Sequence, residues 1–407
     1  MMNRVPLIQE GETFLLEGSD RNVKMKLIQL IGAGATYLAY KAVEEVNGIS
    51  RRVCIIKEYY PAEKGVLEYK REKTGEPLCL VANNHFLQIF SEEQVQALLQ
   101  EEIQNQEENA KQEVQKATEL FYNATKQENS PFLYQTEYFT RMGDTYYLKV
   151  DTSEGRTLHD YLKETEKGYL SLREGLEITK KLLEVTKQVL GDRYLHGDIK
   201  PQNIWMCGNG AALTPILLDL GSAFKREEYC CEGFESWSEE EILSKADSIV
   251  KNKGIGCSTK GYCNRKVNAF YDAKVAYCGA KELAEWKATP ENKRFRKKAA
   301  VQLLETMLQV DASSDLYSIL ETMSYCVTPK NSKLEMKGDE AAYTFFSKIL
   351  KKNREEGYDS VEQVQSDLKK LERILNKDAE PEVLLAAIRA TLPDISDIDP
   401  KLFGKII

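Results

Sequence analysis

The octapeptide at residues 196–203, His-Gly-Asp-Ile-Lys-Pro-Gln-Asn, constrains the chain more than any other segment. It places a carboxylate (Asp198), an ammonium group two residues later (Lys200) and a carboxamide five residues later (Asn203) in one short stretch. These groups suit phosphoryl transfer, because that reaction uses a base for the acceptor hydroxyl, a cation for the migrating group and an oxygen ligand for Mg²⁺.

The octapeptide resembles the catalytic loop of eukaryotic-like (Hanks-type) serine/threonine protein kinases, His-Arg-Asp-x-Lys-x-x-Asn, in a style closer to bacterial than to animal members. The resemblance implies an α+β, bilobal fold: a small β-rich N-lobe with a long regulatory helix, and a larger, mostly helical C-lobe. It implies that Asp198 accepts the proton of the substrate hydroxyl and that Lys200 neutralises the phosphoryl group in flight. Gly197 replaces the arginine that often receives an activation-loop phosphate, so a switch through that arginine–phosphate pair is not expected. Serine and threonine occur in the segment, which leaves phosphorylation by another route open.

A second motif, Asp-Leu-Gly at 219–221, follows two predicted strands at 204–206 and 216–218. It is similar to the kinase Asp-Phe-Gly, with leucine in place of phenylalanine. By this resemblance, Asp219 and Asn203 together hold Mg²⁺ through hard oxygen ligands. The alternative is that the Asp and Asn side chains only cap turns, which is a common role for both.

Residues 25–42 predict two strands joined by a glycine-bearing turn. Gly32 and Gly34 would let backbone N–H groups approach phosphate oxygens of ATP, because no Cβ stands in the way. In the kinase pattern Gly-x-Gly-x-x-Gly-x-Val the last two named positions are Tyr37 and Ala39. The third glycine is therefore missing, and an ordinary hairpin turn is the alternative.

After an Asn-Gly turn signal at 47–48, residues 53–61 predict a β-branched strand that carries one lysine, Lys57. A lysine inside an apolar strand is costly to bury unless it is paired. The resemblance supplies its role, because Lys57 matches the strand lysine that holds the α- and β-phosphates of ATP. A lysine that snorkels from an edge strand is the alternative.

Residues 62–90 read as an insertion, with a hairpin that turns at 73–76. A long helix is predicted over 91–127, because Ser-Glu-Glu-Gln at 91–94 has capping-box spacing and neither Gly nor Pro follows until Pro131.

The regulatory helix of a kinase must offer a glutamate to Lys57. Glu113 is the first choice, since apolar residues then follow near its own face at i+4, i+7 and i+8. Glu119 is the competitor, but it would leave polar residues facing the core.

A strand predicted at 145–150 leads into a hinge at 151–155. By the resemblance, Val150 occupies the gatekeeper position, and backbone groups of Asp151 and Ser153 bond adenine. The expected domains are an N-lobe over 1–151, a C-lobe over 152–375 and a C-terminal tail over 376–407.

Residues 258–262, Ser-Thr-Lys-Gly-Tyr, resemble the docking segment Gly-Thr-x-x-Tyr that precedes the kinase Ala-Pro-Glu. Thr259 is there expected to hydrogen-bond Asp198 and Lys200, a feature of serine/threonine kinases. By the same resemblance, Asp315 in a later helix is expected to hold the backbone of the catalytic loop.

Lysine stands at 266, where the family has a structural glutamate, and glycine stands at 357 in place of its arginine partner. Removing one partner of a buried ion pair would strand the other charge. The glutamate and the arginine are both absent, so neither charge would be left buried without its partner. The sequence therefore predicts no ion pair between positions 266 and 357.

Residues 222–312 are longer than the matching region of the family. Their cysteines lack the tight Cys-x₂₋₄-Cys spacing of structural zinc sites, so free thiols are expected. Residues 226–242 are acidic with interleaved aromatic residues and predict a mobile loop. The alternatives are that the segment docks a basic partner or lies over the cleft. A regulatory partner could bind at 222–312 or at the helix over 91–127. The cysteines are Cys230, Cys231, Cys257, Cys263 and Cys278.

Composition limits the partners. A net charge of −8 over 407 residues argues against a nucleic-acid surface. No apolar run approaches the length of a membrane span, and no secretory signal is visible. Nine cysteines, an odd number, then favour reduced thiols and a cytoplasmic location.

The resemblance as a whole implies Mg-ATP-dependent transfer of the γ-phosphoryl group to Ser or Thr hydroxyls of a protein substrate. Lys200 followed by Pro201 favours Ser/Thr over Tyr substrates by analogy with the family. One alternative is a small-molecule phosphotransferase of the aminoglycoside or choline kinase type, against which the segment at 258–262 speaks. The other is a pseudokinase that binds nucleotide or acts as a scaffold. The missing third glycine favours a pseudokinase. The joint presence of Lys57, Asp198, Asn203 and Asp219 argues against one.

Overall fold

The chain is described by a computed structural model that divides into two compact units, Met1–Gly155 (unit 1) and Arg156–Ile407 (unit 2). The division falls at residue 155 rather than at 151. The residues described are 4–18, 20–34, 36–61, 66–83, 90–125, 136–151, 155–191, 193–208, 213–220, 223–227, 230–251, 259, 261–327 and 339–377. Nearly all of the tail expected over 376–407 therefore lies outside them.

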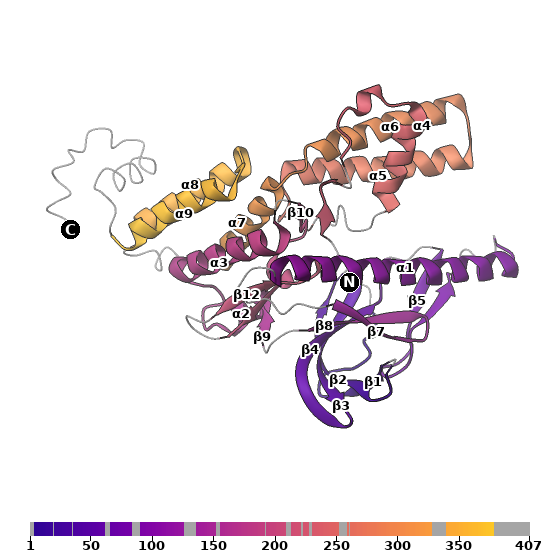
Figure 1. The fold of residues 1–407 in the computed structure, drawn as a ribbon, viewed down its shortest axis with the longest axis horizontal. Coiled ribbons are helices and arrows are strands. Elements are labelled where there is room, and N and C mark those ends of the chain that lie inside the picture. Colours follow the sequence, from indigo (N-terminus) through magenta and orange to yellow (C-terminus); the bar gives the residue numbers. More distant parts are fainter. Residues whose placement is uncertain are drawn as a thin grey trace. The chain divides into compact units, whose positions relative to one another are not determined.

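Unit 1 is built around a curled, six-stranded antiparallel sheet in the order β1-β2-β3-β4-β8-β7 (Figure 1). The turn between β3 and β4 is the predicted one: Asn47 and Gly48 have φ of 52° and 77°, as a type I′ hairpin requires. Met25, Tyr40 and Leu148 are fully buried in the core of the unit. The strands are β1 (Phe14–Glu17), β2 (Val23–Ala33), β3 (Tyr37–Val46), β4 (Ile49–Tyr59), β7 (Thr136–Met142) and β8 (Thr145–Asp151).

The predicted long helix is α1 (Glu92–Thr125), which runs along the sheet of unit 1 and contacts β7 and β8 (Figure 1). It begins at the expected capping box. Ser91 Oγ accepts the N–H of Gln94 (3.3 Å), and Gln94 Oε1 accepts the N–H of Ser91 (2.9 Å). Ala110, Ala117 and Leu120 are fully buried at helical spacing, so one stripe of a largely polar helix packs inward.

The insertion at 62–90 contains the predicted hairpin, formed by β5 (Leu67–Lys70) and β6 (Cys79–Ala82). It turns at the expected place, where the N–H of Glu76 donates to Lys73 O (3.3 Å).

Arg71, just after β5, ties this hairpin to the sheet through an ion pair with Glu58 of β4. Both side chains are fully shielded from solvent. Arg71 makes two hydrogen bonds to the carboxylate, one of them from Nη1 to Oε2 at 3.2 Å. The hydroxyls of Tyr40 (2.8 Å) and Tyr147 (2.6 Å) donate to the same carboxylate. Burial of Glu58 is tolerated because each of its oxygens is hydrogen-bonded and its charge is compensated.

Unit 2 is mostly helical. Its helix α3 begins at the expected capping box of Ser171 and Glu174 and packs against α7. Strands β11 and β12 pair antiparallel close to the two predicted positions. No helix within the described part of the chain is both long and apolar enough to cross a bilayer. The helices are α2 (Leu158–Glu164), α3 (Leu172–Leu190), α4 (Glu239–Lys251), α5 (Arg265–Trp286), α6 (Pro290–Leu308), α7 (Ser313–Val327), α8 (Glu340–Glu355) and α9 (Val361–Leu375). The strands are β9 (Gly155–Thr157), β10 (Tyr194–Leu195), β11 (Ile204–Cys207), β12 (Thr214–Leu217) and β13 (Phe224–Lys225).

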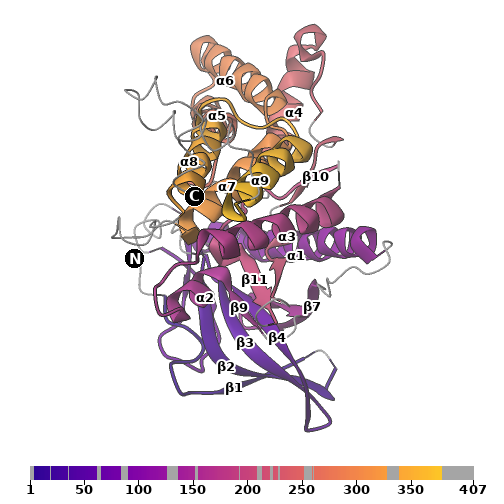
Figure 2. The ribbon, with the colours of Figure 1, turned by 90° about the vertical axis from the view of Figure 1, so that its left-hand side faces the viewer.

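The expanded region over 222–312 folds as a helical cluster, in which α4, α5 and α6 pack together around a hydrophobic core (Figure 2). Cys231 and Cys263 are buried in that core, whereas Cys230 is exposed and Cys257 lies outside the described residues. Within the described residues, no group of three or more His, Cys, Asp or Glu side chains is placed to hold a metal ion.

The prediction of a mobile loop over 226–242 is wrong for its described part. Phe234 is buried, and α4 begins within the segment. The missed signal is a Ser-x-x-Glu box: Ser238 Oγ accepts the N–H of Glu241 (3.3 Å), whose side chain accepts the N–H of Ser238 (2.7 Å). Apolar residues at helical spacing then follow. Their packing on α5 and α6 stabilises the helix and offsets the entropy lost when the segment becomes ordered. They are Ile242, Ala246 and Ile249.

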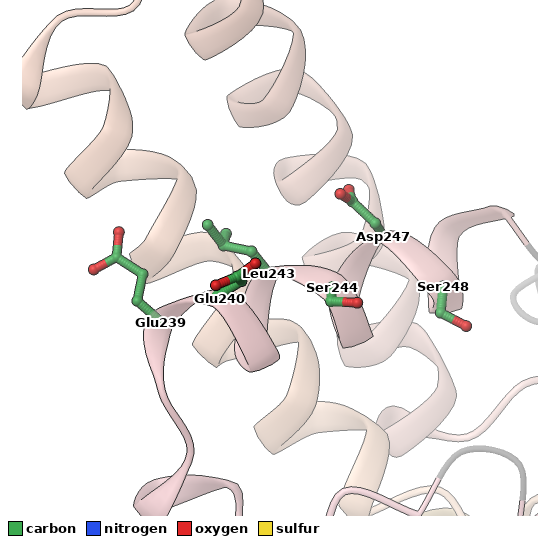
Figure 3. A pocket seen from close by; sticks show the side chains of 6 residues that line it. All are labelled: Glu239, Glu240, Leu243, Ser244, Asp247 and Ser248. Carbon is green, nitrogen blue, oxygen red and sulfur yellow. The ribbon is translucent and has the colours of Figure 1, made fainter.

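One face of α4 lines a pocket of about 780 Å³ (Figure 3). Its carboxylates do not all remain available, because Asp247 accepts hydrogen bonds from Tyr277 (2.8 Å) and Arg296 (2.9 Å) and pairs with Lys281 (3.1 Å). No residue expected at the functional site from the sequence lines it. The lining residues are Glu239, Glu240, Leu243, Ser244, Asp247 and Ser248.

Replacing Arg71 tests the buried pair. Arg71→Met leaves the Glu58 carboxylate buried without its counter-charge, so we expect a loss of about 3–5 kcal/mol in the free energy of unfolding, measured by denaturant titration. Glu17→Gln, which breaks an exposed pair with Lys24, is the matched control and should leave the midpoint nearly unchanged. Equal midpoints for the two variants would contradict the structural role given to Arg71.

Candidate functional site

Unit 1 brings Lys57 and Glu113 together. Lys57 lies in β4 opposite Ala39 of β3, and its Nζ is 3.2 Å from Glu113 Oε1 on α1. The two side chains are 11% and 12% exposed, so the pair is largely shielded from water. Of the two glutamates considered from the sequence, Glu113 is the one that makes this contact.

The second oxygen of Glu113 is held by Tyr37, the residue that stands in place of the third glycine. Tyr37 Oη donates to Glu113 Oε2 (2.6 Å) and lies 3.0 Å from Tyr146 Oη. Lys57 Nζ is 5.2 Å from the centroid of the Tyr37 ring, a cation–π distance. Burial raises the pKa of Tyr37 well above its usual range, and the charge of Glu113 raises it further, so the hydroxyl stays protonated and acts as a donor.

Gly32 and Gly34 lie at the turn between β2 and β3. Neither has a left-handed φ, and a Cβ added to either would meet no described atom closer than 3.7 Å. Neither the backbone conformation nor the packing of described neighbours therefore requires glycine at these two positions. The space beside the backbone is open to a ligand. Gly34 O accepts a hydrogen bond from Arg4 (2.5 Å), and Gly34 N–H donates to Tyr37 O (2.9 Å). No sequence motif predicts Arg4 at this turn.

Val150 and Asp151 end β8 and are both buried. The Asp151 carboxylate pairs with Arg52 (3.2 Å) and Lys149 (3.4 Å), so its role is structural and only the backbone is available for the expected contact with adenine. Burial raises the pKa of Asp151 although the two cations oppose the shift. Ser153 lies outside the described residues.

In unit 2, Asp198, Lys200, Asn203 and Thr259 form one hydrogen-bonded cluster. Lys200 Nζ lies 2.5 Å from Asp198 Oδ2 and 2.8 Å from Thr259 Oγ1, and Thr259 Oγ1 donates to Asp198 Oδ1 (2.8 Å). Asn203 Nδ2 donates to both O and Oδ2 of Asp198 (2.9 Å each). Three side chains thus orient one carboxylate that is 6% exposed.

Asp315 of α7 holds the loop that carries this cluster. Its two carboxylate oxygens accept the backbone N–H groups of His196 (2.7 Å) and Gly197 (3.0 Å). The His196 side chain adds a second support, since Nε2 lies 2.8 Å from Leu218 O and Nδ1 accepts the N–H of Asp198 (3.3 Å). Burial raises the pKa of Asp315, while His196 and the two N–H groups act against that shift.

The hairpin of β11 and β12 brings Asp219 near Asn203 along the backbone, because the N–H of Leu218 donates to Asn203 O (2.8 Å). Asp219 has φ of 61°, a left-handed conformation that few residues other than Gly, Asn and Asp adopt. The NH₂ group of Asn203 is committed to Asp198, so Oδ1 is the amide atom suited to a cation. Two hard oxygen donors fit Mg²⁺, which takes its remaining ligands from phosphates and water. Gly221 lies outside the described residues.

Positions 266 and 357 do not pair, and other ion pairs stabilise this part of unit 2. Lys266 Nζ bonds Asp311 (2.7 Å), and Gly357 follows the end of α8 with φ of 86°. Arg354 of α8 makes two hydrogen bonds to Glu321 of α7 (2.9 and 2.7 Å). Sequence spacing does not predict that pair, because its residues lie in separate helices.

No protein-family model matches the chain, and no curated protein matches it. Solved structures similar to it include vaccinia related kinase 3, at 14% identity, covering 97% of this chain and 94% of that one with a TM-score of 0.41. Two double mutants of the Mycobacterium tuberculosis PknI kinase domain are 15% identical, with 69% and 70% of this chain and 95% of those chains covered and a TM-score of 0.29. Likenesses this distant carry no argument for an activity. The α+β, protein kinase-like fold is recognised from the curled sheet with α1 in unit 1 and the predominantly helical unit 2.

The role of Asp315 is tested by Asp315→Asn. The amide offers one oxygen for two N–H donors, so we expect a loss of about 1–3 kcal/mol in stability and faster hydrogen exchange at the amides of His196 and Gly197. Asp272→Asn, at an exposed position on α5, is the control. Unchanged exchange at both amides would show that Asp315 does not hold the loop.

Proposed function

We propose that the protein is a Mg-ATP-dependent protein kinase that transfers the γ-phosphoryl group of ATP to Ser or Thr hydroxyls of a protein substrate. The observation that carries the proposal is the Asp198 cluster, in which a buried carboxylate is oriented by Lys200, Asn203 and Thr259 through bonds of 2.5–2.9 Å. The Lys57–Glu113 pair in unit 1 supports it independently.

Each group has a chemical task in this proposal. Asp198 takes the proton of the acceptor hydroxyl, and Lys200 neutralises charge on the transferred phosphoryl group. Lys57, kept in place by Glu113, binds the α- and β-phosphates. Bound Mg²⁺ would lower the negative charge of the triphosphate, and Asn203 and Asp219 are the residues that would hold it.

Selectivity for Ser and Thr over Tyr is part of the proposal and rests on Thr259. Its hydroxyl donates to Asp198 and accepts from Lys200, so it fixes the base and the cation relative to each other. The cytoplasm is the proposed location.

Two other functions give different outcomes in the same assay. A small-molecule phosphotransferase would label small alcohols and no protein. A pseudokinase would bind nucleotide without turnover, and the occupation of the third glycine position by Tyr37 is the observation in its favour.

The catalytic assignment is tested by phosphorylation with labelled ATP in the presence of Mg²⁺, on the protein itself and on a general protein substrate. Lys57→Met should weaken ATP binding and transfer together. Asp198→Asn should leave binding nearly intact and lower transfer by about 10²–10⁴-fold, the usual contribution of a positioned base. Lys26→Met, at an exposed position of β2, is the control for Lys57→Met. Equal incorporation by wild type, Lys57→Met and Asp198→Asn would remove the catalytic assignment.

The hydroxyl of Thr259 is tested by comparing Thr259→Val with Thr259→Ser. Valine keeps the shape but loses the bonds to Asp198 and Lys200, so we expect kcat to fall about tenfold or more, since a bond to a charged group contributes about 1.5–3 kcal/mol. Serine keeps the hydroxyl and should retain most of the activity. Equal rates for the two variants would show that the hydroxyl does not position the base.

A further inference from the structure

We infer that Tyr37 is a positioning residue: its hydroxyl holds Glu113 against Lys57, so that unit 1 assembles this pair through its own contacts. The inference rests on the proposed function, in which Lys57 binds phosphate. It gives a task to the residue that replaces the third glycine of the turn.

The geometry divides the Glu113 carboxylate between two donors. Oε1 faces Lys57 Nζ at 3.2 Å, and Oε2 receives the Tyr37 hydroxyl at 2.6 Å. With only the lysine contact, the carboxylate could rotate about its side-chain torsions. A second donor on a different strand fixes its orientation, as a bidentate partner would.

Tyr37 is itself held in place from two sides. In the sheet it lies opposite Tyr59 of β4, with ring centroids 5.7 Å apart in an edge-to-face contact. Its hydroxyl lies 3.0 Å from that of Tyr146 on β8. Tyr37 donates its one hydroxyl proton to Glu113, so it accepts from the hydroxyl of Tyr146. The chain of hydroxyls therefore runs from β8 through β3 to α1.

The position of Tyr37 in its strand explains why it can reach both partners. It lies two residues before Ala39, the register partner of Lys57, so Tyr37 and Lys57 face the same side of the sheet. The ring then lies beside Lys57 Nζ, at 5.2 Å from ring centroid to nitrogen. One tyrosine thus contacts both members of the pair, and its buried hydroxyl keeps its proton.

The test compares Tyr37→Phe, which removes only the hydroxyl, with Tyr59→Phe, which removes a hydroxyl from the neighbouring ring. Lys57 accessibility is read by its rate of acylation with a dilute amine-reactive reagent, followed by mass spectrometry of the full-length protein. Tyr37→Phe should raise that rate several-fold and lower kcat for phosphoryl transfer about tenfold, the effect expected for a bond to a carboxylate. Tyr59→Phe should change neither. Thermal unfolding of both variants shows whether they fold like wild type.

A double-mutant cycle with Glu113→Ala separates positioning from general packing. If Tyr37 acts through Glu113, adding Tyr37→Phe to Glu113→Ala changes Lys57 acylation no further, whereas independent effects would multiply and overturn the inference. Unchanged acylation and unchanged kcat in Tyr37→Phe alone would also overturn it. If the wild type transfers no phosphate but Tyr37→Phe still raises acylation through Glu113, the positioning stands and the proposed kinase activity fails.

Discussion

Strand β4 carries two charged residues in succession, Lys57 and Glu58, and both are buried. Successive side chains of a strand point to opposite faces of the sheet, so the two charges need partners on opposite sides. Lys57 finds Glu113 on α1, and Glu58 finds Arg71 beside the inserted hairpin. A shift of one residue in the register of β4 would exchange these faces and leave both charges without their partners. The need to pair both charges therefore determines the register of β4, the position of α1 on the sheet and the attachment of the hairpin.

In unit 2, as in unit 1, buried polar side chains from distant elements fix the geometry, here that of a loop. The segment that carries Asp198 has little regular structure of its own, and its geometry comes from side chains that bond its backbone. Asp315 fixes its beginning from a buried helix, and Asn203 and Thr259 fix the carboxylate itself. In the proposed function Asp198 is the base, and a base held by several directed bonds needs little reorganisation when a substrate hydroxyl arrives.

Much of this could be predicted from the sequence, because the signals are local. Capping boxes at Ser91 and Ser171 mark where α1 and α3 begin, and the Asn47–Gly48 turn sets the hairpin of β3 and β4. The apolar residues on its own helix face favour Glu113 over Glu119, and Glu113 contacts Lys57 in the structure. The same capping-box signal stands at Ser238, within the acidic segment over 226–242 for which the sequence predicts a mobile loop, and α4 begins there.

What the sequence could not give are contacts between distant segments with no motif behind them. Nothing in spacing connects Arg71 to Glu58, Arg354 to Glu321 or Arg4 to Gly34. Tyr37 shows the limit most clearly. In the sequence motif, Tyr37 only marks the absence of the third glycine. The structure is needed to see that its hydroxyl donates to Glu113. A departure from a family pattern can thus supply a new contact as well as remove an old one.

The central claim of the proposed function is that Lys57, held by Glu113, contacts the phosphates of a bound nucleotide. An acyl-phosphate derivative of ATP measures this directly, because it transfers its acyl group to an amine beside the phosphates. The account predicts that Lys57 is the acylated lysine and that excess Mg-ATP blocks the labelling. Acylation that is spread over surface lysines, or that Mg-ATP does not reduce, would contradict the account.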